Sequence, residues 1–202
     1  MIPTDGYASN CYILTCGAHS AIVDPSAELK EITEAVKNSD SKVDYILLTH
    51  GHFDHMLTLD TLRGAIEAKV CIHIDDNEKL GSPQKSMFSL LGPYSKSFSE
   101  AECKLNDGDT ILLGEEEIKV IHTPGHTQGS VCYNCGDFIL TGDTLFDMSV
   151  GRCDFPGGSI EELRNSIRKL YDLDLSAKIY PGHGNSSDLY TQKMFNPYTK
   201  DI

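Results

Sequence analysis

The chain has 202 residues, which is the size of one domain rather than two. Hydrophobic residues make up 40% and charged residues 23%, an ordinary composition that excludes disordered and fibrous proteins. The 17 basic and 30 acidic side chains give a formal net charge of −13, which disfavours binding to nucleic acid or to an anionic membrane surface. We therefore expect a single domain over 1–202.

The apolar pattern predicts strands and helices in alternation. In chain order, we expect strands at 10–15 and 21–23, a helix at 28–38, a strand at 43–48, a helix at 57–68, a strand at 69–74, helical turns near 76–80 and 84–91, strands at 110–113, 118–122, 130–133 and 138–140, a helix from Ile160 capped by Ser159 and Glu162, a strand at 177–180 and a short helix at 188–195. This order predicts mixed sheets covered by helices.

Cysteine usage and targeting signals bear on location. The seven cysteines are spread along the chain, and several fall inside apolar strands, which favours a reducing compartment over a disulfide framework. Cys132 and Cys135 form a CxxC in which we expect a hairpin rather than a zinc ribbon. The sequence shows no secretory signal and no apolar run of the roughly 18 residues that span a membrane, so we expect a cytoplasmic protein.

The ends of the predicted strands carry the chemistry. Five apolar runs end in Asp or His beside Gly or Pro, at Asp24, 49–55, 122–126, 141–143 and 181–183. Strand ends on a rigid scaffold are places where loops direct side chains into one cleft. We expect these five segments to meet there.

The segment Thr49–His55 has the ligand chemistry of a metal site. It contains three His and one Asp directly after a buried strand, and imidazole nitrogens and carboxylate oxygens are zinc ligands. With contributions from three other strand ends, the candidate ligands are His50, His52, Asp54, His55, His126, Asp143 and His183. This set suffices for two ions of about four ligands each if one carboxylate bridges them. We interpret His19 and His73 as ordinary surface or core residues, and the role of His122 stays open.

The motif THxHxDH at 49–55, together with Asp24, His126, Asp143 and His183, resembles that of the metallo-β-lactamase-fold hydrolases. The resemblance covers nearly the whole chain and implies an α/β fold, a four-layer αββα sandwich with the metals at one edge of two mixed sheets. The segments 125–130, 141–146 and 151–158 are most similar to the short, single-domain members of the glyoxalase II-like, hydroxyacylglutathione hydrolase-like branch.

That resemblance assigns roles to the candidate ligands. It implies that His50, His52 and His126 hold one metal, that Asp54, His55 and His183 hold the other, and that Asp143 bridges. It also implies that Asp24 orients a ligand histidine rather than binding metal. Two departures stand out: about nineteen residues follow His183, which we expect to be too few for the helical domain that grips glutathione, and relatives tend to begin with a strand before the segment that matches Ile2-Pro3, which leaves open whether that edge strand is missing here.

We therefore expect a metal-dependent hydrolase with two divalent ions, zinc above iron or manganese. A hydroxide bridging the ions would attack the carbonyl of a small acyl-thiol ester, with Asp54 orienting the water. Arg152 either binds a substrate carboxylate or pairs with Asp154. The sequence leaves open the substrate, the thiol carrier, the metal and the oligomeric state.

Three alternatives remain at this point. A persulfide dioxygenase would hold one iron on His50, His126 and Asp143 and leave the second group empty. A metallo-hydrolase of the same design could act on another ester or on a lactone. A non-catalytic metal-binding domain is the third, although every ligand position is filled.

Overall fold

The first sheet is five-stranded and mixed, as the alternating elements predict. The computed structural model describes residues 1–4, 6–92 and 95–202. The strands lie in chain order, and they are β1 (Tyr12–Cys16), β2 (His19–Val23), β3 (Lys42–Leu47), β4 (Lys69–His73) and β5 (Cys103–Leu105). β1 and β2 are antiparallel, whereas β2 to β5 run parallel. The parallel strands therefore end at one edge of the sheet.

The second sheet has six strands in the order β13-β12-β9-β8-β7-β6. Its strands are β6 (Thr110–Leu113), β7 (Glu116–His122), β8 (Val131–Asn134), β9 (Phe138–Gly142), β12 (Lys178–Pro181) and β13 (Ser187–Asp188). Only the β9–β12 pair is parallel, so this sheet is mixed as well. A separate hairpin pairs β10 (Leu145–Phe146) with β11 (Ser149–Val150).

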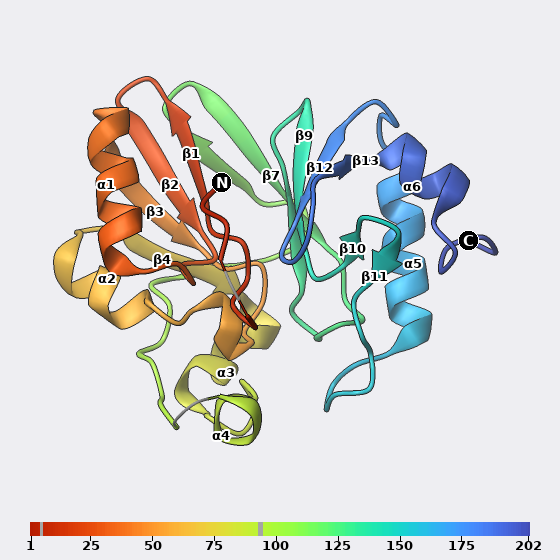
Figure 1. The fold of residues 1–202 in the computed structure, drawn as a ribbon, viewed down its shortest axis with the longest axis horizontal. Coiled ribbons are helices and arrows are strands. Elements are labelled where there is room, and N and C mark those ends of the chain that lie inside the picture. The colour runs from red at the N-terminus through yellow and green to blue at the C-terminus, as the bar shows by residue number, and fades with distance from the viewer. Residues whose placement is uncertain (5, 93–94) are drawn as a thin grey trace.

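Helices cover the outer faces of both sheets (Figure 1). On the first sheet lie α1 (Leu29–Ser39) and α2 (Leu59–Ala65), and on the second lie α5 (Ile160–Tyr171) and α6 (Leu189–Phe195), whereas α3 (Asn77–Gly81) and α4 (Phe88–Leu91) lie below the first sheet in this view. The short helices η1 (Phe53–His55) and η2 (Ile74–Asp76) follow β3 and β4. The expected four-layer αββα sandwich is confirmed.

Three apolar clusters fill the spaces between the layers. Successive residues of a strand face opposite sides, so Ile46 packs toward the helices of the first sheet and Leu47 toward the second sheet. The central cluster joins Leu47 to Val120 and Tyr133, all buried. The third cluster sets α5 against the second sheet. The sheets are thereby held at a fixed spacing.

The structure differs from the predicted elements where they are short or irregular. β5, β10, β11 and β13 have two or three residues each and were not expected. α2 begins later than predicted and ends at Ala65, because Ile66 is already extended. The expected turn at 84–91 is helical in its last part, as α4. Ile2 forms a single antiparallel bridge to Cys11.

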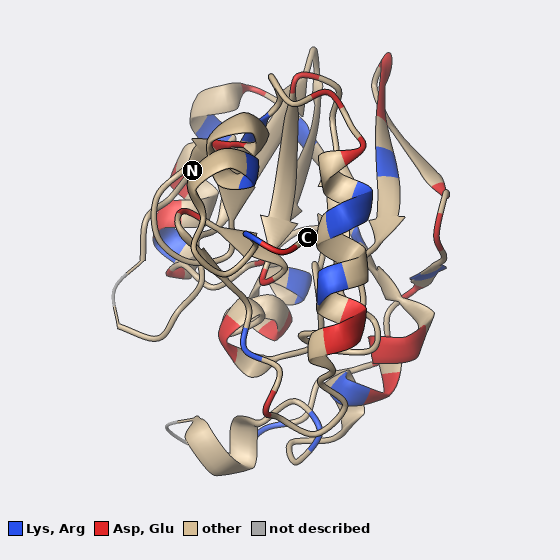
Figure 2. Ribbon diagram, turned by 90° about the vertical axis from the view of Figure 1, so that its right-hand side faces the viewer, with Lys and Arg blue, Asp and Glu red and all other residues tan. Residues whose placement is uncertain are grey.

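Helix α5 shows the predicted cap and a matching distribution of charge. Ser159 Oγ accepts a hydrogen bond from the Glu162 N–H, as the capping pattern predicts. Glu161 and Glu162 lie in the first turn and Arg168 and Lys169 in the last, an order that complements the helix dipole (Figure 2). All seven cysteines are unpaired thiols. Within the described ranges, no helix combines the length and apolar character needed to cross a membrane.

Candidate metal centre

The seven candidate side chains lie together at the edge where the strands of both sheets end. The loop after β3 supplies four of them, and the β7–β8 loop, the end of β9 and the end of β12 supply one each. Their ligand atoms form three overlapping groups, each within 4.8 Å: His50, His52 and His126; His50, His55 and Asp143; Asp54, His55 and His183. Residues up to 129 positions apart in sequence, Asp54 and His183, are thus neighbours in space.

The first group consists of three buried imidazoles. His52 Nδ1 lies 3.2 Å from His50 Nε2 and 2.9 Å from His126 Nε2. Nitrogens bound to one tetrahedral zinc at its usual bond length lie about 3.3 Å apart, so this spacing suits a shared ion. His126 Nδ1, on the far side of its ring, donates to the Arg152 carbonyl and so leaves Nε2 facing the group.

The second group is joined to the first by Asp143. Within the second group, which is Asp54, His55 and His183, Asp54 Oδ2 lies 3.2 Å from His183 Nε2 and 3.9 Å from His55 Nε2. Asp143 Oδ1 lies 3.3 Å from His55 Nε2, and Asp143 Oδ2 lies 3.5 Å from His126 Nε2 and 3.7 Å from His183 Nε2. The Asp143 carboxylate therefore faces ligand atoms of both groups.

Two buried polar atoms at this junction make no hydrogen bond within the described residues. They are His55 Nε2 and Asp143 Oδ1. Their partner is each other, as an ion pair at 3.3 Å, and leaving buried polar atoms without hydrogen bonds is costly, so native structures usually supply a further partner such as an ion. Divalent cations between the groups would supply that partner, so the donor set fits two ions.

The pKa values of these groups follow from burial and from their neighbours. Burial lowers the pKa of His50 well below its usual range and that of His52 to about 3, so both rings are neutral and offer lone pairs. Burial also opposes charge on His55, but Asp24 and Asp143 outweigh it and raise its pKa. Burial would raise the pKa of Asp143, whereas His55, His126 and His183 lower it. Asp143 is therefore a carboxylate.

Asp24 bonds the nitrogen of His55 that faces away from the other ligands. Asp24 Oδ2 accepts hydrogen bonds from His55 Nδ1 and Thr49 Oγ1, each at 2.8 Å, and Asp24 Oδ1 accepts from the Thr49 N–H at 2.8 Å. The Nδ1 contact turns His55 Nε2 toward Asp143. Asp24 itself has a left-handed φ of 51°, a conformation that Asp tolerates better than most residues. This geometry suits a residue that orients a ligand.

Asp76 is a functional residue that the sequence did not indicate. It is fully buried, and its Oδ2 accepts from the Gly51 N–H at 2.7 Å and from Thr127 Oγ1 at 2.8 Å. Its Oδ1 accepts from the Gly129 N–H at 3.0 Å. One carboxylate thus ties the loop that carries His50 and His52 to the loop that carries His126. A Cβ at Gly129 would lie 2.6 Å from Asp76 Cβ, so a residue larger than glycine at this position would clash with Asp76.

His122 does not enter the centre. Its Nε2 donates to the Gln128 carbonyl at 2.8 Å, and its ring stacks on that of His73 with centroids 4.0 Å apart and planes at 12°. The two rings and Asp75 could form another metal group by distance. Imidazole lone pairs lie in the ring plane, however, so two stacked rings do not direct them at one point. We interpret this pair as a packing contact.

Arg152 forms the ion pair that was one of its two expected roles. Its Nε and a terminal nitrogen donate to the two carboxylate oxygens of Asp154 at 2.7 and 2.6 Å. Its guanidinium carbon also lies 3.9 Å above the Phe155 ring centroid. The side chain is therefore already engaged on both its edge and its face.

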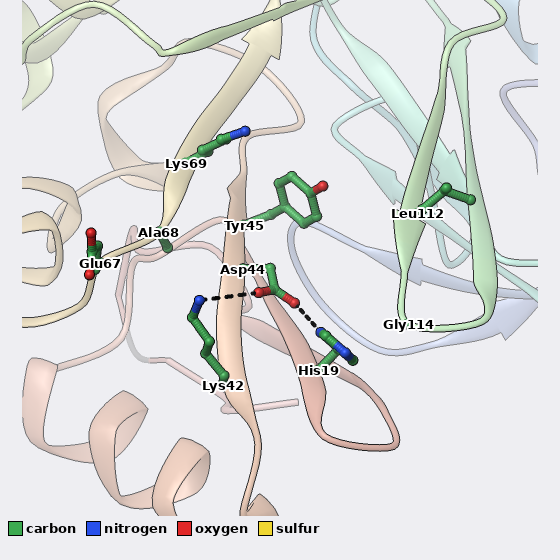
Figure 3. Close-up of a pocket in the computed structure, with 9 residues that line it drawn as sticks. All are labelled: His19, Lys42, Asp44, Tyr45, Glu67, Ala68, Lys69, Leu112 and Gly114. Atoms are coloured by element: carbon green, nitrogen blue, oxygen red, sulfur yellow. Dashed lines mark hydrogen bonds and ion pairs between the residues drawn. The ribbon is translucent and has the colours of Figure 1, made fainter.

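The metal groups form the floor of a pocket of about 550 Å³. A second pocket, of about 590 Å³, lies where β2, β3 and β4 begin, at the edge away from the ligands (Figure 3). There Asp44 pairs with His19 at 2.6 Å and with Lys42 at 4.0 Å, so the exposed His19 is a surface residue. Asp44, His19 and Lys42 of this pocket are thus paired with one another.

Comparison with known proteins identifies the family. The model of the metallo-β-lactamase superfamily matches residues 4–183. The chain belongs to this superfamily. Among curated relatives, a protein of Mycobacterium leprae named only as uncharacterized ML0493 is 35% identical over 96% of this chain and 94% of its own. The probable metallo-hydrolase YqgX of Bacillus subtilis is 30% identical over 98% and 95%, and the probable polyketide biosynthesis zinc-dependent hydrolase PksB of the same species is 30% identical over 94% and 82%.

Solved structures agree with the fold of this superfamily member. The B3 metallo-β-lactamase BLEG-1 superposes with a TM-score of 0.93 at 29% identity, over 98% of both chains. TTHA1623, solved in a di-iron-bound form, gives 0.87 at 28% identity, also over 98% of both. ETHE1 from Myxococcus xanthus gives 0.79 at 25% identity, over 95% of this chain and 79% of its own.

Proposed function

We propose that this superfamily member is a thioester hydrolase of the glyoxalase II-like type that works with two divalent metal ions. The observation that carries the proposal is Asp143, whose two oxygens face His55 on one side and His126 and His183 on the other. A carboxylate in that position suits a bridge between two ions. The names of two relatives, the probable metallo-hydrolase YqgX and the probable zinc-dependent hydrolase PksB, support hydrolysis as the reaction class.

The chain supplies the positioning that such a reaction needs. Two bound ions would provide a water of low pKa and polarise the carbonyl of the substrate. Asp54 Oδ2 reaches the pocket next to His183 and can accept a hydrogen bond from that water, which fixes its direction of attack. The water oxygen then forms the new acyl C–O bond, the C–S bond breaks, and the proton passes to Asp54 and on to the departing thiolate or to solvent. A thiolate leaves without a strong general acid.

Zinc is the metal we propose, since the relative PksB is named as zinc-dependent, and the neutral imidazoles of His50 and His52 suit zinc. The di-iron form of TTHA1623 makes iron the competing choice. Both metals accept the same His and Asp donors, so the residues fit either.

A mononuclear-iron persulfide dioxygenase is the second candidate. The likeness to ETHE1 and the compact set of His50, His126 and Asp143 favour it. The complete second group, in which Asp54 lies 3.2 Å from His183, favours the binuclear hydrolase. A related hydrolase of esters or lactones would use the same residues.

The deciding experiment combines metal analysis with two activity assays on the purified protein. We expect about two equivalents of metal per chain, hydrolysis of an acyl-thiol ester and no oxygen uptake with a persulfide. One iron with oxygen uptake would establish the dioxygenase instead. Bound metal with neither activity, and with no ester or lactone cleaved, would indicate a metal-binding domain.

Replacing the proposed bridge tests the ligand assignment. Asp143→Ala should lower the content of both metals and reduce kcat/KM by more than about 100-fold, beyond the effect of removing an outer partner. Asp137→Ala is the matched control, because Asp137 is exposed and lies before β9, at the opposite end of the strand. Full metal content in Asp143→Ala would show that the carboxylate is not a ligand.

A further inference from the structure

The walls of the metal pocket differ in chemistry from its floor. The floor consists of candidate ligands, whereas the walls are Tyr7, Phe53, Met87, Leu91, Phe146, Val150 and Phe155. These side chains come from separate segments: the N-terminal loop, η1, α4 with its cap, the β10–β11 hairpin and the loop before α5. A substrate that reaches the metals therefore passes between apolar and aromatic surfaces.

Two of the aromatic walls touch the proposed ligands directly. The Phe155 ring meets His52 edge to face at 5.8 Å between centroids, and the Phe146 ring meets His183 in the same way at 6.2 Å. Tyr7 packs on Phe53 at 5.6 Å. The apolar surface thus begins at the ligands and continues to the rim, with no polar ring of residues between them in the described part of the pocket.

The rim also leaves apolar surface in contact with water. Leu91 on α4 is 50% exposed and Tyr7 on the N-terminal loop is 50% exposed, and both line the pocket. Covering such apolar surface with a ligand removes it from water, which contributes favourably to the free energy of binding. It favours an occupant with an apolar part long enough to reach from the metals to α4.

Charge in the pocket argues against an anionic carrier. Among the described lining residues, Arg152 is the one Lys or Arg, and Asp154 and Phe155 already engage it. Asp54 and Asp143 on the floor are carboxyl groups, and the chain carries a net charge of −13. Carboxylates of a peptide thiol would find little to pair with outside the metals themselves.

We propose that the pocket selects thioesters whose acyl group is apolar and whose thiol carries no carboxylate. This inference rests on the proposed thioester hydrolysis and names its substrate class. The acyl chain lies along Phe155, Phe146 and Leu91, and the carbonyl lies over the ligands. Polar recognition is confined to the reacting carbonyl.

A chain-length series tests the acyl preference. Acetyl, butyryl and hexanoyl thioesters of N-acetylcysteamine share one neutral thiol, and kcat/KM should rise by about 4-fold per methylene while the chain stays buried. The lactoyl group, on the same thiol and on glutathione, tests the carrier. We expect no gain from glutathione. A flat series, or a tenfold advantage for the glutathione ester, would overturn the inference.

Neighbouring leucines of α4 provide a matched pair of variants. Leu91 lines the pocket, whereas Leu90 is 72% exposed and does not line it. Leu91→Asp should lower the hexanoyl-to-acetyl ratio of kcat/KM by at least about tenfold, since the charge removes the apolar rim. Leu90→Asp should leave that ratio unchanged. Equal effects of both substitutions would contradict the assignment of Leu91.

Binding without turnover separates this inference from the proposed reaction. On the metal-loaded protein, the affinity for acetate, butyrate and hexanoate should rise with chain length, and Leu91→Asp should abolish the rise. If the rise occurs but no thioester is hydrolysed, the apolar pocket stands and the thioesterase proposal fails. If thioesters are hydrolysed and neither series depends on chain length, the reaction stands and the pocket assignment fails.

Discussion

Two buried aspartates hold different parts of the metal centre. Asp24 bonds His55, a member of the second group, whereas Asp76 bonds the backbone on either side of the first group. Neither carboxylate lies among the grouped ligand atoms. The centre is therefore built with an outer support for each proposed ion, as is usual for metal sites.

Replacing Asp76 should weaken the first metal more than the second. In Asp76→Asn, an amide NH₂ would face the Gly51 or Gly129 N–H, and the loops carrying His50, His52 and His126 would lose their common anchor. We expect the affinity for one metal to fall by about 10- to 100-fold. Titration of the metal-free protein with Co²⁺, followed by absorption, would resolve the two binding steps.

Asp75→Asn is the control for that titration. The Asp75 side chain is 53% exposed, and its ion-pair partner among the described residues is His73 rather than a residue of either metal loop, so both binding steps should keep their affinities. Asp24→Asn should instead weaken the step that involves His55. The division of roles fails if Asp76→Asn weakens both steps equally or neither.

At the residue scale, the sequence indicated the ligands, and the family resemblance indicated the supporting Asp24, but neither indicated Asp76. The ligands share a spacing and a place after strands, so they could be recognised together. Asp76 stands in the run His73-Ile74-Asp75-Asp76, where nothing in the letters distinguishes the buried carboxylate from the exposed one. Gly182 is similar, because only the structure shows why a glycine is needed there: a Cβ would lie 2.6 Å from His55 Cε1.

Among the elements, the start of α5 lies next to the first metal group. The Ser159 N–H donates to the Gly125 carbonyl at 2.8 Å, one residue before His126, and its side chain caps the helix. A Cβ at Gly125 would lie 2.6 Å from Leu163 Cβ, so the loop and the helix are in close contact. The position of His126 thus depends on how α5 begins.

Removing that cap should cost stability without removing the loop contact. Ser159→Ala loses the acceptor for the Glu162 N–H, and the free energy of unfolding should fall by about 1 kcal/mol in urea denaturation. Ser159→Asp keeps an acceptor and places a negative charge at the positive end of the helix, so it should retain the stability of the parent. Equal losses in both variants would mean that the cap contributes nothing.

Elements with strong periodicity were predicted closely, and those fixed by the fold were not. The helix at 160–171 and the strands β3, β4 and β6 show their apolar pattern in the letters. β5, β10, β11 and β13 are too short for any pattern, and each exists because a neighbouring strand or hairpin offers it hydrogen bonds. The pocket walls on the β10–β11 hairpin belong to this less predictable class, whereas α4 lies within the helical turn expected at 84–91.

For the molecule as a whole, the proposed ions connect the two sheets. The ligands after β3 belong to the first sheet, whereas those after β9 and β12 belong to the second. Ions shared between them would add contacts that the unfolded chain lacks. The single-domain organisation and the cytoplasmic location stay predictions from the sequence.

Metal removal should therefore lower the melting temperature. A ligand present at about 1,000 times its dissociation constant adds about 4 kcal/mol, and for a chain of this size that corresponds to roughly 10 °C. We expect chelation to produce a decrease of this order in a thermal scan, and Zn²⁺ to reverse it. An unchanged melting temperature after verified removal of metal would show that the ions do not support the fold.

The segments that surround the pocket mouth have a consequence for how such a scaffold diversifies. The candidate metal ligands lie at strand ends, whereas much of the apolar pocket wall that a substrate contacts belongs to α4, the N-terminal loop and the β10–β11 hairpin. Insertions, deletions or exchanges in those three pieces can retarget the catalyst while its chemistry is inherited intact. Grafting them between homologues is thus a direct route to altered selectivity.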